Sequence, residues 1–92
     1  MLSKQLSVGQ VVRATSGREQ GRLFFIVKVI DSEYVLIADG KKRKLGKPKL
    51  KKVKHLERYN VINDEIKNKL RSNKDTVDAF LRAQLTKLNQ SI

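Results

Sequence analysis

The 92-residue chain contains no cysteine, no tryptophan and only one proline. The lack of cysteine excludes a disulfide framework, a thiolate metal site and a cysteine nucleophile, and it fits a reducing compartment. No apolar run approaches the ~20 residues of a membrane span, and the first residues, MLSKQLSVGQ, lack the apolar core of a secretion signal. We therefore expect a cytoplasmic protein that makes no membrane contact.

Residues that carry enzymatic chemistry are also scarce. His55 is the only histidine, and its sequence neighbours are basic or apolar. A catalytic metal site usually needs three clustered ligands, whereas Asp31, Glu33 and Asp39 lie at expected turns, where acids are common. The glycine-bearing stretch 16–22 lacks the Lys-Ser/Thr ending of a nucleotide P-loop. We predict no enzyme activity, no catalytic residue, no metal and no cofactor.

Acids are few relative to bases. Nine Asp and Glu face 21 Lys and Arg, which gives a formal net charge of +12. Such an excess on one small domain predicts fast, salt-sensitive association with a polyanion. The charge is clustered, because residues 41–54 hold nine basic side chains and no acid, whereas the segment from Tyr59 onward is nearly balanced. This clustering favours nucleic acid as the partner.

Short apolar runs of β-branched and aromatic residues, separated by turn residues, predict five strands. The run LFFIVKVI has apolar residues on both faces until Lys28, so we expect it to be buried on both sides for part of its length, as in a small closed barrel. Asp39-Gly40 predicts a type I′ hairpin, and Pro48 then interrupts the sheet. The spacing indicates a barrel or a sandwich. The predicted strands are 8–15, 23–30, 33–38, 41–45 and 52–56.

From residue 63 the apolar period changes to that of helices. Asn63 or Asp64 can cap a short helix that ends near Leu70, and Asp75 can cap a longer one that ends near residue 89. We therefore expect a β domain over residues 1–58 and a helical C-terminal extension over 59–92. The amphipathic helices must pack on each other, on the β domain or on a protein partner, and their role is left open.

Two segments carry the candidate RNA-binding residues. The loop 16–22 offers Arg18 and Arg22, whose guanidinium groups suit phosphate or a base edge, although Glu19 could pair with one of them. His55 is either a packed residue or a contact to a base. Tyr34 is the best candidate for stacking on a base. The basic segment supplies Lys41, Lys42, Arg43, Lys44, Lys47, Lys49, Lys51, Lys52 and Lys54.

The stretch VGQVVRATSGREQGRLFFIVKVID resembles the KOW motif, in which a strand, a basic loop and a second strand surround a characteristic glycine, here Gly21. With VLIADGKKRKLGKPKLKKVKHL, the likeness extends over residues 8–56. This stretch is similar to small KOW-containing RNA-binding proteins of bacteria, which are related to archaeal and eukaryotic large-subunit ribosomal proteins. Residues 58–92 have no counterpart in this resemblance.

The resemblance implies a five-stranded SH3-like barrel, here followed by two short helices, that binds RNA, most often ribosomal RNA. It adds Arg13 to Arg18 and Arg22 as residues flanking the RNA-facing loop. KOW barrels of NusG-type elongation factors contact protein instead. We therefore expect a ribosome-associated RNA-binding protein, and the alternative is a protein-interaction module of translation or transcription whose basic face only localises it. A small DNA-coating protein is a third possibility.

Overall fold

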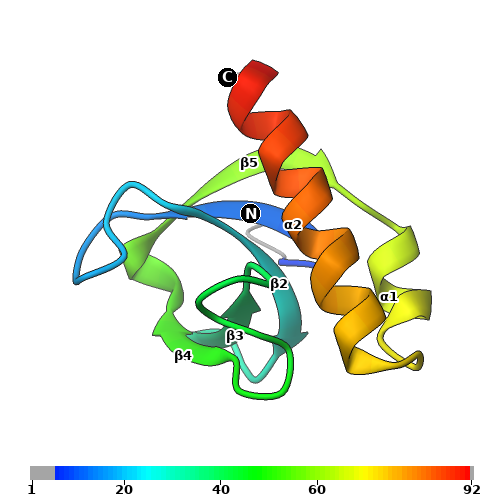
Figure 1. Ribbon diagram of the computed structural model, residues 1–92. Coiled ribbons are helices and arrows are strands. Elements are labelled where there is room, and N and C mark those ends of the chain that lie inside the picture. The colour runs from blue at the N-terminus through cyan, green and yellow to red at the C-terminus, as the bar shows by residue number, and fades with distance from the viewer. Residues whose placement is uncertain (1–5, 92) are drawn as a thin grey trace.

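The computed structural model describes residues 6–91 and shows a mainly β protein, in which five antiparallel strands form one sheet and a C-terminal helix lies against it (Figure 1). Residues 1–5 of the predicted β domain and Ile92 of the predicted extension lie outside the described residues. The strand order is β4-β3-β2-β1-β5. The strands are β1 (Gln10–Ala14), β2 (Leu23–Val29), β3 (Tyr34–Ala38), β4 (Lys49–Lys52) and β5 (Leu56–Ile62).

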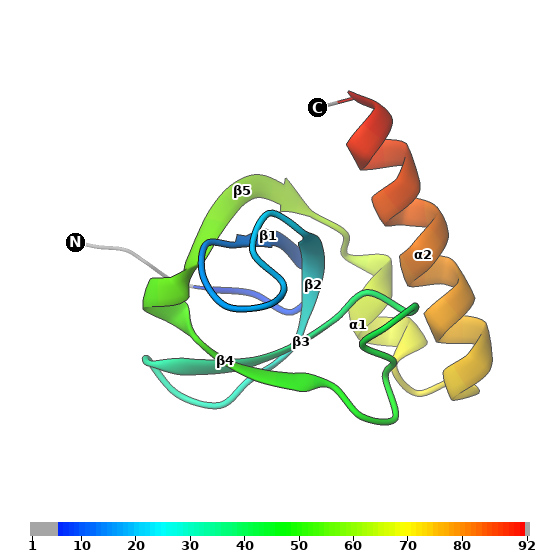
Figure 2. The same ribbon diagram turned by 60° about the vertical axis from the view of Figure 1, so that its left-hand side comes forward.

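The sheet is strongly curved, and seen end-on its strands surround the loop between β1 and β2 (Figure 2). Irregular register between Gln10 and Val12, and between Ile26 and Lys28, marks the places where bulges can bend the sheet. The edge strands β4 and β5 follow each other through the 3-10 turn η1 (Val53–His55). Within residues 6–91 no backbone ladder joins these two edges, so the sheet is open where a closed barrel was expected.

The central strand β2 is buried on both faces over residues 23–27, as its sequence predicted, and Lys28 and Val29 are exposed. Phe24 and Ile26 pack on the concave side with residues of β1 and β3. Phe25 and Val27 belong to a second apolar cluster on the opposite side. The register places Val11 opposite Phe25 and Val12 opposite Phe24, which continues both clusters into β1. Two cores therefore share one sheet.

The helical layer covers the second cluster. It consists of α1 (Glu65–Lys69) and α2 (Lys74–Ser91). Ile66, Val77, Leu81 and Leu85 are buried in the same cluster as Phe25, so the apolar stripe of α2 packs on the sheet. The helical segment therefore completes the core of the β-sheet.

The predicted cap is wrong at α2 and confirmed at α1, where Asn63 was one of the two candidates. Asp75 does not cap α2; it lies in the first turn, and Asn73 Oδ1 instead accepts the backbone N–H of Asp75 at 2.8 Å. Asn73 directly precedes the helix, so its side chain can accept an N–H group of the first turn that has no partner inside the helix. At α1, Asn63 Oδ1 accepts the N–H of Glu65 at 3.0 Å, and the side chain of Asp64 makes no capping hydrogen bond.

The predicted type I′ hairpin and its returning strand 41–45 are wrong. Only Gly40 of the pair Asp39-Gly40 has a positive φ, +78°, whereas a type I′ turn needs two such residues. The carboxylate Oδ1 of Asp39 accepts the N–H groups of Lys41 and Arg43, each at 2.9 Å, and so folds the chain into a compact loop. The strand partner of β3 is β4, which begins only after Pro48.

The predicted last strand, 52–56, is also wrong. Lys52 ends β4, η1 turns the chain, and β5 runs from Leu56 to Ile62. Strand β5 pairs with β1, with Val12 opposite Arg58 and Ala14 opposite Leu56. The sequence boundary expected after residue 58 therefore falls inside a strand.

Candidate RNA interface

The predicted RNA-binding residues come from three neighbouring parts of the fold. Arg13, Arg18 and Arg22 belong to β1 and to the β1–β2 loop (residues 15–22). A second group lies in the basic loop, defined here as residues 39–48 between β3 and β4. The third group lies in β4 and η1. The basic loop holds Lys41, Lys42, Arg43, Lys44 and Lys47. Strand β4 and η1 hold Lys49, Lys51, Lys52, Lys54 and His55.

The β1–β2 loop is built on backbone hydrogen bonds. Gly21 N–H donates to the carbonyl of Ala14 at 2.8 Å, and Ala14 N–H donates to the carbonyl of Arg22 at 3.0 Å. Gly21 has φ +88°, but a Cβ at this position would meet no atom within 4 Å. The glycine is therefore favoured by its backbone conformation, not by a lack of room, and the surface above it is open.

Glu19 joins this loop to the basic loop. It is buried, with 8% of its surface exposed, and its Oε2 accepts a hydrogen bond from Arg43 Nε at 2.9 Å. The sequence suggested a partner among Arg18 and Arg22, but the partner lies 24 positions away. The hydrogen bond from Arg43 lowers the pKa of Glu19 against the opposing effect of burial, and the nearby charges of Arg43, Lys49 and Lys51 lower it further.

Two further arginines of the predicted site have partners within the protein. Arg22 pairs with Asp39 at 3.4 Å, which gives a second link between the β1–β2 loop and the basic loop. Arg13 Nε donates to the hydroxyl of Tyr59 at 2.6 Å, and its Nη1 donates to the carbonyl of Gly21 at 3.2 Å. Arg13 therefore holds the β1–β2 loop against β5.

The lysines of β4 alternate in direction, because successive residues of a strand point to opposite faces. Lys49 and Lys51 are half-buried, and Lys51 Nζ donates to the carbonyl of Ser16 at 3.1 Å. The outward-facing Lys52 lies over the ring of Tyr34, 6.0 Å from its centroid. His55 is half-buried in η1, where its backbone carbonyl accepts the N–H of Thr15 at 2.9 Å.

The remaining cations of the predicted site form an exposed, uncompensated surface. None of them forms an ion pair with an acid in the described part of the chain. Most lie on or next to the basic loop, where the irregular backbone projects side chains into solvent. The uncompensated cations are Arg18, Lys41, Lys42, Lys44, Lys47, Lys52 and Lys54, all of them exposed.

No pattern in the sequence pointed to Arg82, which supports this surface from α2. Its Nη1 donates to the carbonyl of Gly40, 42 positions away. Asp78 of the same helix accepts the N–H of Leu45 at 2.8 Å. A Cβ at Gly40 would overlap the carbonyl oxygen of Asp78, so the basic loop is closely packed on α2. A helical pattern in the sequence cannot reveal a contact that exists only after folding.

The described residues contain no group of three or more His, Asp or Glu side chains that could hold a metal ion. No helix within residues 6–91 combines the length and the apolar character needed to cross a membrane.

No protein-family model matches the chain. A curated protein of Bacillus subtilis (strain 168), described as "Putative ribosome-binding protein YbzG", is 32% identical to it over 63 residues. The match covers 68% of this chain and 85% of the relative.

Proposed function

The chain belongs to the family of the Bacillus subtilis protein YbzG, and on that premise we propose that it associates with the ribosome by binding ribosomal RNA. The observation that carries the proposal is the set of exposed, uncompensated lysines on and beside the basic loop. Phosphate groups on RNA match such a surface, because each bound cation releases counterions from the nucleic acid. The name of the relative supports the ribosome as the source of that RNA.

The proposed interface comprises the basic loop, the exposed face of β4 and the tip of the β1–β2 loop. The pairs Arg43–Glu19 and Arg22–Asp39 fix the two loops relative to each other. A preformed surface loses less conformational entropy on binding than a flexible one does. Side chains cannot reach the bases in the deep major groove of A-form RNA, so recognition is of shape and backbone.

We assign the strand–loop–strand unit of β1 and β2 to the KOW type and the curved sheet to an SH3-like barrel. The support is the antiparallel pairing of β1 with β2, the positive φ of Gly21 at the end of their loop, and the curvature of the sheet around that loop. The proposal includes no enzymatic activity.

The alternative of a protein-interaction module relied on the apolar stripe of α2 as the partner's binding site. Val77, Leu81 and Leu85 of that stripe are buried in the core cluster. They are therefore not available to a partner in the folded protein, which favours RNA binding through the basic surface.

A titration of ribosomal RNA with the full chain at several salt concentrations tests this proposal. If about six cations contact phosphate, log K should fall with log salt with a slope of about −4 to −5. The variant Lys42→Glu/Lys44→Glu/Lys47→Glu should bind much more weakly. The control Lys67→Glu/Lys69→Glu/Arg71→Glu changes the same net charge on α1 and the turn that follows it, and it should bind nearly as the wild type does.

A flat salt response, or equal losses in the two triple variants, would contradict RNA binding through the basic loop. Competition with duplex DNA is a further arm of the titration. If duplex DNA displaced the RNA with comparable affinity, a general nucleic-acid coat would replace the ribosomal proposal.

A further inference from the structure

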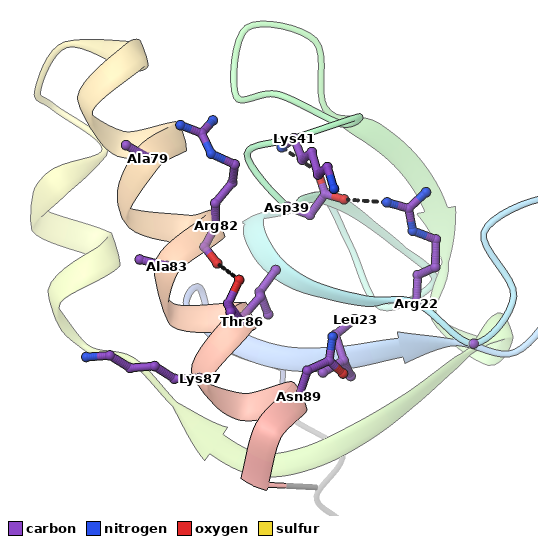
Figure 3. A pocket seen from close by; sticks show the side chains of 12 residues that line it. Arg22, Leu23, Asp39, Lys41, Ala79, Arg82, Ala83, Thr86, Lys87 and Asn89 are labelled. Carbon is purple, nitrogen blue, oxygen red and sulfur yellow. Dashed lines mark hydrogen bonds and ion pairs between the residues drawn. The ribbon is translucent and has the colours of Figure 1, made fainter.

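A cleft of about 790 Å³ lies between α2 and the sheet, and it shares Arg22 and Lys41 with the site predicted from the sequence. The start of β2, the basic loop and one side of α2 form its walls (Figure 3). Its size falls within the range of about 300–1,000 Å³ that is typical of ligand sites. The cleft opens next to Lys41, so it continues the proposed RNA interface toward the C-terminal helix.

Positive charge dominates this cleft. Arg22, Lys41 and Arg82 line it, and the only acid among the lining residues is Asp39. The carboxylate of Asp39 already accepts two backbone N–H groups of the basic loop, and its contact with Arg22 is long, 3.4 Å. Arg82 donates to a backbone carbonyl, which carries no net charge and so leaves the charge of the arginine uncompensated.

The lining also offers small and apolar surfaces. Leu23 and Leu85 are both 6% exposed, and Ala83 contributes only a methyl group. Figure 3 shows Arg82, Thr86 and Asn89 on the side of α2 that faces Arg22 and Leu23, while Lys87 points the other way. Thr86 Oγ1 donates to the carbonyl of Arg82 at 2.9 Å, which ties its hydroxyl to the helix.

We propose that this cleft binds the sugar–phosphate backbone of an unpaired RNA segment, so that α2 forms one wall of the RNA interface. The inference rests on the proposed function and extends it to a second surface. Phosphates would contact Arg22, Lys41 and Arg82. The riboses and bases would lie against the apolar parts of the lining, and the guanidinium planes are available for stacking.

An RNA strand fits this cleft better than an acidic peptide does. No backbone edge of a strand is exposed among the lining residues for pairing with a peptide, and the cations are spread over three elements, as a phosphodiester chain with several charges requires. No aromatic side chain lines the cleft, so strong base-specific stacking is not expected and binding should depend little on sequence.

Substitutions at Asn89 test the cleft, because this residue is exposed, lines the cleft and carries no charge. Asn89→Glu should weaken the binding of ribosomal RNA about three- to tenfold, since it places a negative charge beside the bound phosphates. Asn89→Lys should strengthen binding and steepen the salt slope by about 0.7 to 0.9. The controls Asn68→Glu and Asn68→Lys make the same changes at an exposed position of α1 outside the cleft, and they should have effects below about twofold.

A second measurement distinguishes contact from long-range attraction. A photo-crosslinking residue at Thr86 should cross-link to ribosomal RNA, whereas the same residue at the exposed Thr76 of α2 should not. If wild-type protein binds RNA but the Asn89 and Asn68 variants behave alike and Thr86 does not cross-link, the cleft is not part of the interface. If wild-type protein binds no RNA, the proposed function itself fails. If inorganic phosphate or a mononucleotide at micromolar concentration displaced the RNA, the ligand of the cleft would be a small anion and not an RNA strand.

Discussion

Arg43 Nε donates to Oε2 of Glu19 at 2.9 Å, and this contact joins the basic loop to the β1–β2 loop across the end of the curved sheet. Both loops were predicted to face RNA. The pair therefore has a structural role within the proposed interface, because it fixes the positions of neighbouring lysines. The carboxylate of Glu19 also neutralises the charge of Arg43, so this arginine is not free to bind phosphate. Lys49 and Lys51 are close enough to lower the pKa of Glu19 further.

Replacing Glu19 with Gln should destabilise the protein by about 1–3 kcal/mol, because it leaves the half-buried Arg43 without its charged partner. The effect should depend on pH. The folded-state pKa of Glu19 is lowered, so the ion pair's contribution is complete above the ordinary value of about 4.3 and is lost as the pH falls through the lower folded-state pKa. Urea unfolding at pH 7 and at pH 3 measures this. A difference between wild type and variant that did not shrink at the lower pH would contradict the assignment.

Gly40 and Gly21 offer a matched pair of substitutions. Both have positive φ, +78° and +88°, but only at Gly40 would a Cβ overlap another atom, the carbonyl oxygen of Asp78. Gly21→Ala should cost about 1–2 kcal/mol of stability, the price of the left-handed conformation. Gly40→Ala should cost a further 1–3 kcal/mol or so, because the basic loop must move away from α2. Thermal unfolding of the two variants tests this difference, and equal costs would show that the loop is not closely packed on the helix.

Leu81 tests whether α2 is part of the folding unit. Its side chain is fully buried in the cluster that contains Phe25 of β2. Leu81→Ala should therefore destabilise the whole chain by about 2–5 kcal/mol, with helix and sheet unfolding in one transition. Circular dichroism follows the helix, and the fluorescence of Tyr34 and Tyr59 follows the sheet. If the helix melted first while the tyrosine signal stayed native, the helix would be a separable extension.

Much of the fold follows from local patterns in the sequence. The apolar residues on both faces of LFFIVKVI indicated a strand with a core on each side, and the helical period placed the stripe of α2. The patterns predicted whether a segment is a strand or a helix better than they predicted the loops that connect these elements. Asp39-Gly40 is compatible with a hairpin, but the Asp39 side chain binds the two N–H groups that follow and produces a loop.

The candidate site was less predictable, because a list of basic residues does not say which are exposed. Arg43 and Lys51 belong to the same dense run as Lys42 and Lys44, yet they bind Glu19 and the carbonyl of Ser16. Their partners lie 24 and 35 positions away. The contribution of Arg82 likewise depends on the packing of α2 against the basic loop, which no local pattern encodes.

We propose that the protein associates with the ribosome through the exposed lysines of the basic loop. Sedimentation of the full chain with purified ribosomal subunits tests it most directly. Wild-type protein and the Lys67→Glu/Lys69→Glu/Arg71→Glu variant should sediment with the subunits at moderate salt, while Lys42→Glu/Lys44→Glu/Lys47→Glu should remain in the supernatant. Equal sedimentation of the two triple variants, or no sedimentation of the wild type, would contradict the claim.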